Sequence, residues 1–259
     1  MPRALVTGAG KRIGRAMALY LAQRGYDVAV HYVSSAVDAG TVVAQIRQMG
    51  CQAAALQADF LDEEATANLL PAAAQALDGP ITCLVNNASI FEHDTIDTAT
   101  RTSWDRHMGS NLRAPFVLTQ AMAAQGLTAA TDEAGEPKAV AHILNMIDMR
   151  VRKLTPQFMT YTLAKATLWT LTQTSAQALT PAIRVNAIGP GPTMKGARQS
   201  PAHFAEQCRN TISGRGAHPA DIVAALGYFL DAPAVTGQLL CVDGGQHLAW
   251  ETPDLIGVE

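Results

Sequence analysis

The chain has 259 residues, of which 48% are hydrophobic and 16% are charged, and its formal net charge is −3 at pH 7. This weakly acidic balance gives no positive field for nucleic acid or an anionic membrane, so neither is an expected partner and small-molecule chemistry is favoured. No window approaches about 18 uninterrupted apolar residues, which argues against a membrane-spanning helix.

The cysteines and the N-terminus indicate a reducing compartment. Cys51, Cys83, Cys208 and Cys241 are scattered without a CxxC pair, as is typical of reduced, buried thiols. The N-terminus leads into a strand-like run without the apolar segment of a signal peptide. The seven histidines do not pair at ligand spacing. We therefore expect a cytoplasmic protein without a metal site.

Short apolar runs alternate with amphipathic segments of helical length. The predicted strands cover residues 3–7, 27–32, 52–58, 81–86, 140–146, 183–188 and 238–242. The predicted helices cover residues 13–24, 36–49, 62–77, 100–125, 156–179 and 219–231. Gly25 is a C-cap candidate, and Thr155 and Pro156 mark a predicted helix start. The alternation predicts an α/β fold: a single-domain, Rossmann-type, doubly wound parallel sheet of about seven strands with helices on both faces.

Two segments interrupt this alternation. Residues 126–138 are a predicted exposed loop, and residues 192–217, which include Lys195 and Arg198, are a predicted substrate lid. There is no internal repeat and no linker between domains, so residues 1–259 are predicted to form one dinucleotide-binding and catalytic domain.

A glycine-rich turn, TGAGKRIG, joins the first strand to the first helix at residues 7–14. Its glycines, Gly8, Gly10 and Gly14, let the backbone approach a pyrophosphate at the helix N-terminus. The last glycine stands one residue later than in GxGxxG, and a turn without a ligand is the alternative reading. The position of this turn after the first strand of several strand–helix units favours a dinucleotide.

The residues that follow the second strand favour a phosphorylated ribose. An NAD site usually has an acid at the end of this strand, whereas HYVSS, residues 31–35, is followed by no carboxylate before Asp38. Lys11 and Arg12 in the turn, with Ser34 and Ser35, can instead donate to a 2′-phosphate. NADP(H) is therefore the predicted cofactor. A solvated charge at the helix start is the alternative reading of Arg12.

Tyr161 and Lys165 lie four residues apart and so share one face of a predicted helix. A phenol is a poor acid at neutral pH, and a cation one helical turn away is expected to lower its pKa. The same lysine can hold the nicotinamide ribose. Alone the pair is a weak signal, and together with the phosphate turn it predicts a hydride-transferring enzyme.

Together these motifs resemble the short-chain dehydrogenase/reductase family over essentially the whole chain. The matching motifs are TGAGKRIG, LVNNAS (84–89), Asn111, YTLAK (161–165), RVNAIGPGPT (184–193) and VDGG (242–245). The resemblance implies that Tyr161 is the general acid, that Lys165 tunes it and that Asn111 holds a water in a proton relay. It implies a cofactor site formed by Gly8, Gly10, Lys11, Arg12, Ile13, Gly14, His31, Tyr32, Ser34, Ser35, Asp59, Phe60, Asn87, Ala88, Ser89, Tyr161, Lys165, Pro190, Gly191 and Thr193.

Asp148 departs from the family pattern, because the usual residue thirteen positions before the tyrosine is serine. An ionised carboxylate accepts hydrogen bonds and repels the oxyanion that forms when a ketone is reduced. It suits a substrate with N–H donors, and when protonated by burial it can donate to a ring nitrogen. Asp148 therefore points to C=N reduction in a nitrogen heterocycle.

Further features resemble the pteridine reductase branch of this family, which includes bacterial dihydromonapterin and dihydrofolate reductases. They are Arg12 within the turn, HY at the end of the second strand, NNASIF, GSN..AP at 109–115 and the Asp–Tyr–Lys set. The resemblance implies that a pterin stacks between nicotinamide and Phe91. It implies a substrate site of Arg12, Ser89, Phe91, Asp148 and Tyr161. The alternative reading of Phe91 is a loop residue packed on the core. This branch often has an arginine just after the second strand, where this chain has Ser34.

Three functions follow from these observations. The first is an NADPH-dependent reductase of a pteridine-type C=N bond, and the second is a carbonyl reductase of the 3-oxoacyl type that tolerates Asp148. The third is a dinucleotide-binding regulator without catalysis. The family resemblance also implies a homodimer or homotetramer that packs the helices at 100–125 and 156–179 against a partner.

Overall fold

The computed structural model describes residues 1–196 and 199–250. Arg198 of the predicted lid and the last nine residues of the predicted domain lie outside the described residues. Within them, seven parallel strands form one sheet in the order β3-β2-β1-β4-β7-β8-β9. The strands are β1 (Arg3–Val6), β2 (Asp27–Tyr32), β3 (Ala53–Gln57), β4 (Cys83–Asn86), β7 (Ala141–Met146), β8 (Ile183–Pro190) and β9 (Leu239–Val242). The predicted fold class is confirmed.

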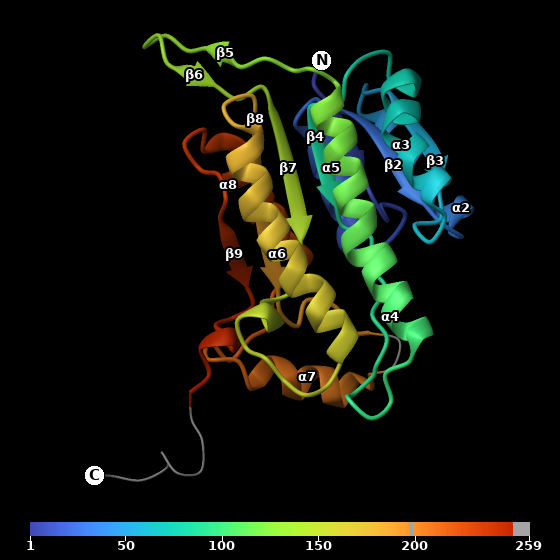
Figure 1. Cartoon of the computed structure of the whole chain (residues 1–259), viewed down its shortest axis with the longest axis vertical. Helices are drawn as coiled ribbons and strands as arrows, with labels where there is room; N and C mark the ends of the chain where they lie inside the picture. Colours follow the sequence, from blue (N-terminus) through green and yellow to red (C-terminus); the bar gives the residue numbers. More distant parts are fainter. Residues whose placement is uncertain (197–198, 251–259) are drawn as a thin grey trace.

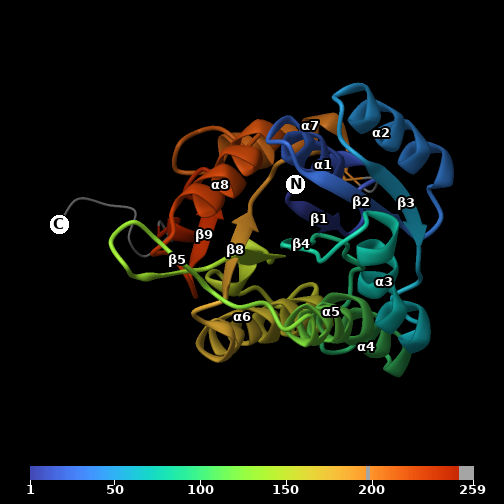
Figure 2. The ribbon, with the colours of Figure 1, turned by 90° about the horizontal axis from the view of Figure 1, so that it is seen from above.

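Helices cover both faces of the sheet, as Figures 1 and 2 show. On one face lie α1 (Arg12–Gln23), α2 (Ala36–Gln48) and α8 (Pro219–Asp231). On the other face lie α3 (Glu63–Ala76), α5 (Ala114–Ala124) and α6 (Met159–Leu179). Each face has its own apolar core, so the central strands are buried on both sides and their sequences show no polar alternation.

The predicted helix at 100–125 is interrupted in the structure. It consists of α4 (Arg101–Met108), a π-helical segment (Gly109–Arg113) and α5. A π-helical segment inserts an extra residue into the helical turn and frequently marks a functional site. Here the segment carries Asn111, the residue that the family resemblance singles out.

The predicted start of the helix at Pro156 is wrong. The helix α6 begins at Met159, and its N-cap residue, Phe158, has a left-handed backbone with φ +56°. This conformation is rare for an aromatic residue and sharply changes the chain direction before the helix. A local Thr-Pro signal could not reveal a turn that is fixed by tertiary contacts.

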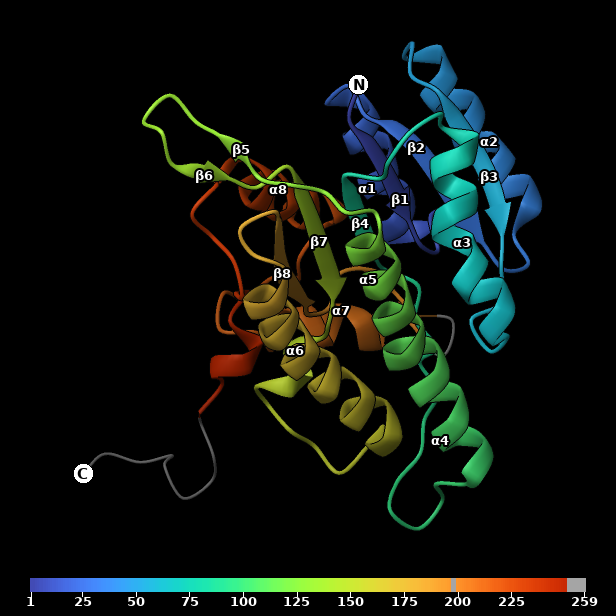
Figure 3. The ribbon, with the colours of Figure 1, turned by 45° about the horizontal axis from the view of Figure 1, so that its top comes forward.

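The two interrupting segments contain short elements of their own. Residues 126–138 include the hairpin of β5 (Ala130–Thr131) and β6 (Pro137–Lys138), which projects at the end of the sheet opposite the carboxyl ends of the strands (Figures 1 and 3). The predicted lid contains α7 (Pro201–Arg209), which lies near those carboxyl ends. No helix in the described part of the chain is long and apolar enough to cross a membrane.

The order of the strands fixes where a ligand can bind. The chain moves outward from β1 through β2 to β3, and then crosses back to β4 on the other side of β1. Loops leave β1 and β4 in opposite directions at this point, which opens a crevice at their carboxyl ends. The glycine-rich turn follows β1 directly.

Candidate active site

A cleft of about 520 Å³ lies over the carboxyl ends of β1, β2 and β4. It brings together most of the cofactor residues that the sequence predicts on the phosphate and adenosine side. Its lining residues are Gly8, Gly10, Lys11, Arg12, Ile13, Gly14, Tyr32, Val33, Ser34, Ser35, Asp59, Phe60, Leu61, Asn87, Ala88, Ser89, Ile90, Arg106 and Ser110.

The glycine-rich turn is packed too tightly for side chains. A Cβ atom at Gly14 would lie 2.3 Å from the carbonyl oxygen of Gly8 and 2.5 Å from the amide nitrogen of Asn87. Gly8 itself has φ +63°, in the left-handed region that favours glycine. Thr7 holds the facing segment, because its hydroxyl accepts hydrogen bonds from the backbone of Asn87 and Ala88 at 2.8 and 2.9 Å. The backbone itself therefore forms the floor of the cleft.

His31 lies behind the turn and is fully buried. Its Nδ1 accepts the N–H of Gly8 at 3.0 Å, so its Nε2 carries the proton and donates to the carbonyl of Ala58 at 3.0 Å. Burial lowers the pKa of His31. The ring stacks on Phe60 with centroids 4.5 Å apart. His31 thus joins β1, β2 and β3 and shapes the turn. Its direct contact with a cofactor stays a prediction.

The two cations of the turn already have partners within the protein. Lys11 forms an ion pair with Asp38 at 2.9 Å, and both side chains are about half exposed. Arg12, with φ +54°, donates from its guanidinium to the carbonyl oxygens of Lys195 and Met194 at 2.9 and 3.0 Å. Arg12 therefore links the cofactor cleft to the predicted lid.

Tyr161 and Asp148 meet at the centre of the predicted catalytic set. The Tyr161 hydroxyl, from α6, donates to Oδ2 of Asp148, at the end of β7, over 3.0 Å. Burial raises the pKa of Asp148, against the backbone hydrogen bond and the charge of Arg150. Burial, followed by the charge of Asp148, also raises the pKa of Tyr161 well above its usual value. We expected a lowered phenol pKa, and in this structure the shift has the opposite direction.

Lys165 lies one helical turn beyond Tyr161 and is buried, with 2% of its surface exposed. Its ammonium donates to the carbonyl of Met146 at 2.8 Å and lies 5.8 Å from the centroid of the Tyr161 ring. Burial lowers the pKa of Lys165 to about 8, partly opposed by Asp148. Tyr161 and Lys165 are thus buried, Asp148 is partly buried, and the phenol O–H donates to the Asp148 carboxyl group.

Asn111 projects from the π-helical segment onto the loop that follows β4. Its Oδ1 accepts the N–H of Ile90 and its Nδ2 donates to the carbonyl of Ile90, both at 2.8 Å. This side chain therefore anchors the segment that carries Ser89 and Phe91. The water relay implied by the family resemblance stays a prediction.

Phe91 lies beside the predicted catalytic residue Tyr161 and has 45% of its surface exposed. Its ring meets Tyr161 edge-on, with centroids 4.7 Å apart, and stacks in parallel on Phe158 at 4.3 Å. Sequence reasoning missed Phe158, because its place depends on the left-handed backbone before α6. The two stacked phenylalanines form one aromatic wall, and Phe91 joins it to the Tyr161 ring.

The end of β8 supplies the other wall. A Cβ atom at Gly189 would lie 3.3 Å from the backbone nitrogen of Met149, so β8 passes directly beside Asp148. The N–H of Gly191 donates to Val242, and a Cβ atom at Gly191 would lie 2.5 Å from that of Asp243. The predicted nicotinamide residues, Pro190, Gly191 and Thr193, follow here. No cluster of His, Cys, Asp or Glu in the described ranges could hold a metal ion.

Several known proteins resemble this chain over most of its length. The family model described as enoyl-(acyl carrier protein) reductase matches residues 8–247. FolM alternative dihydrofolate reductase 1 from Brucella suis, solved in complex with NADP, is 40% identical, and the match covers 98% of each chain with a TM-score of 0.90. A short-chain dehydrogenase from Burkholderia cenocepacia in complex with NADP is 32% identical and covers 95% of this chain and 97% of its own, with a TM-score of 0.84.

One relative is named for a different reaction. The 3-oxoacyl-[acyl-carrier-protein] reductase FabG of Staphylococcus epidermidis is 30% identical over 251 residues, which are 95% of this chain and 98% of that protein. The match of the family model over most of the chain, together with the parallel sheet and its cleft, shows that the chain belongs to the short-chain dehydrogenase/reductase family, whose members are oxidoreductases.

Proposed function

We propose that the chain is an NADPH-dependent reductase of a C=N bond in a pteridine-type ring such as a dihydropterin or dihydrofolate. The hydrogen bond between Tyr161 and Asp148 carries this proposal. Where a ketone is reduced, charge develops on oxygen, and a carboxylate beside it is unfavourable. Where a C=N bond is reduced, the nitrogen takes up a proton, and a phenol paired with a carboxyl group can supply one.

The cleft fits NADP(H). The tight backbone at Gly8 and Gly14 leaves room for a pyrophosphate against the start of α1. Asp38, the first carboxylate after β2, is neutralised by Lys11, so a 2′-phosphate meets hydroxyls and a cation. Structural neighbours solved in complex with NADP support this choice. When bound, NADPH supplies the hydride that adds to the ring carbon.

The chain's own residues then orient the substrate and move the proton. The exposed part of Phe91 would offer a platform for a flat ring. Ser89 and Arg12 are the proposed donors to the edge of that ring. Tyr161 donates its proton to the ring nitrogen, and the Asp148 carboxyl group, 3.0 Å from the phenol oxygen, would return a proton from solvent to the phenolate. Lys165 stabilises the charge that this transfer leaves behind. Residues 192–217 serve as the lid, and Arg12 ties this segment to the turn.

The second candidate is a 3-oxoacyl-type carbonyl reductase. The relative FabG supports it. In that case Asp148 is a tolerated substitution, and Tyr161 with Lys165 would act on a ketone. A dinucleotide-binding regulator is the third candidate and would bind NADPH without turnover.

The deciding experiment follows NADPH oxidation with dihydrobiopterin, dihydromonapterin and dihydrofolate, beside a 3-ketoacyl thioester. We expect turnover of a pterin, and we expect Asp148→Ser to reduce it by about 100-fold or more, the usual contribution of a proton-transferring group. The same variant should not impair any ketone turnover. Tyr161→Phe should abolish both, which a regulator would not show. Ketone turnover with inert pterins would establish the second candidate.

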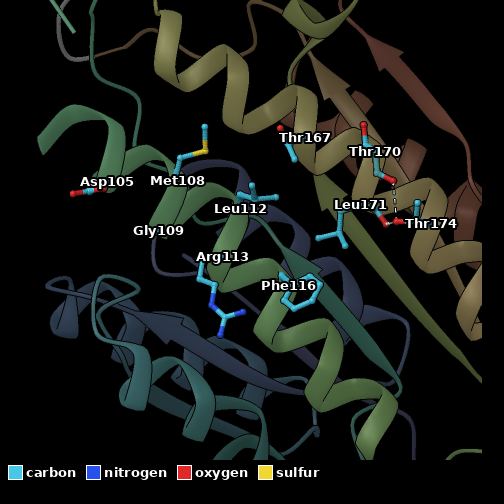
Figure 4. Close-up of a pocket in the computed structure, with 10 residues that line it drawn as sticks. All are labelled: Asp105, Met108, Gly109, Leu112, Arg113, Phe116, Thr167, Thr170, Leu171 and Thr174. Carbon is cyan, nitrogen blue, oxygen red and sulfur yellow. Dashed lines mark hydrogen bonds between the residues drawn. The ribbon is translucent and has the colours of Figure 1, made fainter. Parts of the chain in front are cut away.

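We also propose that the chain is a homodimer or homotetramer in the cytoplasm. An apolar groove of about 620 Å³ lies between α4, the π-helical segment and α5 on one side and α6 on the other, as Figure 4 shows. Its charged rim residues, Asp105 and Arg113, are already paired with Arg101 and Glu63. A second copy offering the same apolar helices would cover it without stranding a charge. The lining residues are Asp105, Met108, Gly109, Leu112, Arg113, Phe116, Thr167, Thr170, Leu171 and Thr174.

A further inference from the structure

Residues 90, 92 and 94 of the segment that carries Phe91 each form hydrogen bonds with another part of the chain. Ile90 is held through its backbone by Asn111. Glu92 donates its N–H to Nε2 of His107 at 3.2 Å, and its carboxylate pairs with Arg106 at 2.8 Å. Phe91 lies between these two anchors and extends into the site. The next anchoring residue, Asp94, forms its hydrogen bonds with a different helix, α6.

Asp94 caps the catalytic helix from a distant part of the chain. The N-cap residue of α6, Phe158, makes no side-chain cap within the described structure. Instead Oδ1 of Asp94 accepts the N–H of Thr160 at 3.1 Å, and the Asp94 carbonyl accepts that of Met159 at 3.3 Å. A carboxylate at this end satisfies orphan N–H groups and complements the helix dipole. Asp94 is 2% exposed, so water does not replace it.

A chain of hydrogen bonds joins the two kinds of anchor. The N–H of Glu92 can only donate, so Nε2 of His107 is an acceptor and its Nδ1 carries the proton. Nδ1 then donates to the Thr160 hydroxyl at 2.6 Å, and that hydroxyl donates to Oδ2 of Asp94. His107 and Thr160 are buried. The direction of every bond in the chain is therefore determined.

The charges of the end groups agree with this direction. Burial lowers the pKa of His107, which keeps the imidazole neutral. Burial alone would raise the pKa of Asp94, but the hydrogen bonds from Thr160 outweigh it and lower that pKa. This direction of hydrogen bonding requires a neutral His107 ring as donor and an ionised Asp94 carboxylate as acceptor.

We propose that Asp94, Thr160 and His107 are positioning residues that hold the Phe91 platform and the Tyr161 hydroxyl in one fixed relation. Thr160 directly precedes Tyr161 on α6, and the Phe91 ring lies against Tyr161. A loss of the chain of hydrogen bonds frees the start of α6 and the platform together. The inference rests on the proposed function for the role of Phe91, and it adds residues that touch neither substrate nor cofactor.

The test compares Thr160→Val, which keeps the shape and removes the hydroxyl, with Thr160→Ser, which keeps the hydroxyl. We expect kcat with the best dihydropterin to fall about tenfold or more in Thr160→Val, since small misplacements of reacting groups are costly. Thr160→Ser should restore most of it. The Kd for NADPH should change much less than kcat in both variants, because the chain of hydrogen bonds does not contact the glycine-rich turn that we expect to hold the pyrophosphate. Equal kcat per folded molecule in the two variants would overturn the inference.

A double-mutant cycle with Phe91→Leu tests the coupling itself. If the residues hold platform and hydroxyl together, the losses in kcat/KM of Thr160→Val and Phe91→Leu are not additive. Additive losses would mean that Thr160 supports only the helix. If Thr160→Val does not fold, Asp94→Asn is tested instead. The new amide N–H donates to the Thr160 hydroxyl, which then donates to Nδ1 of His107 and so reverses the hydrogen bonds. The proton of His107 moves to Nε2, where it faces the N–H of Glu92.

Failure of the substrate proposal would be seen separately. A wild-type enzyme that reduces the 3-ketoacyl thioester and no pterin would refute the pterin assignment. The Thr160→Val and Thr160→Ser comparison would then be run with the thioester, where the same loss and rescue of kcat are expected because Tyr161 acts in both reactions.

Discussion

Lys165 illustrates how far burial alone changes a side chain. The ammonium is enclosed beside Tyr161 and keeps one backbone acceptor, the carbonyl of Met146. Its pKa consequently falls from an ordinary 10.5 to about 8. Asp148 and Tyr161 are shifted in the other direction by the same burial. Burial therefore favours the neutral form of each of the three groups, which suits a site that exchanges protons.

The lowered pKa of Lys165 predicts a pH dependence of stability. Between pH 8 and 10.5 the unfolded chain holds this proton and the folded chain does not, so the free energy of unfolding rises with pH. This stabilisation is lost as the pH falls through about 8. Relative to Lys165→Met, the wild type should gain roughly 2 kcal/mol between pH 7.5 and 9.5. Urea unfolding of both proteins measures the difference, and a difference that is constant with pH would contradict the prediction.

At the scale of elements, the glycine-rich turn depends on close approach rather than on flexibility. Gly14 lies inside α1, without a positive φ, yet a Cβ atom there would overlap the backbone of Gly8. The helix can begin directly under the turn only because this side chain is missing. The same logic explains Gly191, which packs against Asp243.

Gly14→Ala should therefore destabilise the fold by about 1–3 kcal/mol, the usual cost of overpacking. It should also weaken NADPH binding at least tenfold, because the turn must move. Gly40→Ala is the matched control: it is an exposed glycine of α2 with nothing within 4 Å of the added Cβ atom. We expect that control to stabilise the chain by roughly 0.5–1 kcal/mol. Thermal unfolding and NADPH titration measure both. Normal binding in Gly14→Ala would refute the close-packing argument.

At the scale of the whole molecule, the apolar groove between α4, the π-helical segment and α5 on one side and α6 on the other shares no lining residue with the cofactor cleft. Trp104 on α4, Phe116 on α5 and Leu163 on α6 are each about 40% exposed. Large apolar groups gathered on helices of one face mark an interaction surface. A second copy is the occupant that we propose.

Thr170→Arg should shift the protein to a smaller species in sedimentation equilibrium, since a charge in the groove would be desolvated at the interface. Thr41→Arg is the matched control. Both threonines are exposed on helices, and both hydroxyls bond the carbonyl four residues earlier. The control should sediment as the wild type does. A monomeric wild type, or identical behaviour of the two variants, would rule out this interface.

The sequence by itself determined the strands, most helices and the residue types at the site. Apolar runs without alternation identify strands that are covered on both faces, and β2 was predicted with its observed ends. Gly25 was correctly placed beyond the end of α1, where it has φ +81°. The glycine spacing and the Asp148–Tyr161–Lys165 set are local in sequence, so they could be recognised without a structure.

Only the tertiary structure decided how these groups are used. The reversed shift of the Tyr161 pKa, the position of His31 behind the turn and the cap that Asp94 supplies to α6 all depend on contacts between distant segments. Burial and long-range hydrogen bonds leave no periodic pattern in the sequence, because the partners are 13, 23 and 66 residues apart. The chemistry could be anticipated from residue types, whereas its protonation and positioning follow from packing.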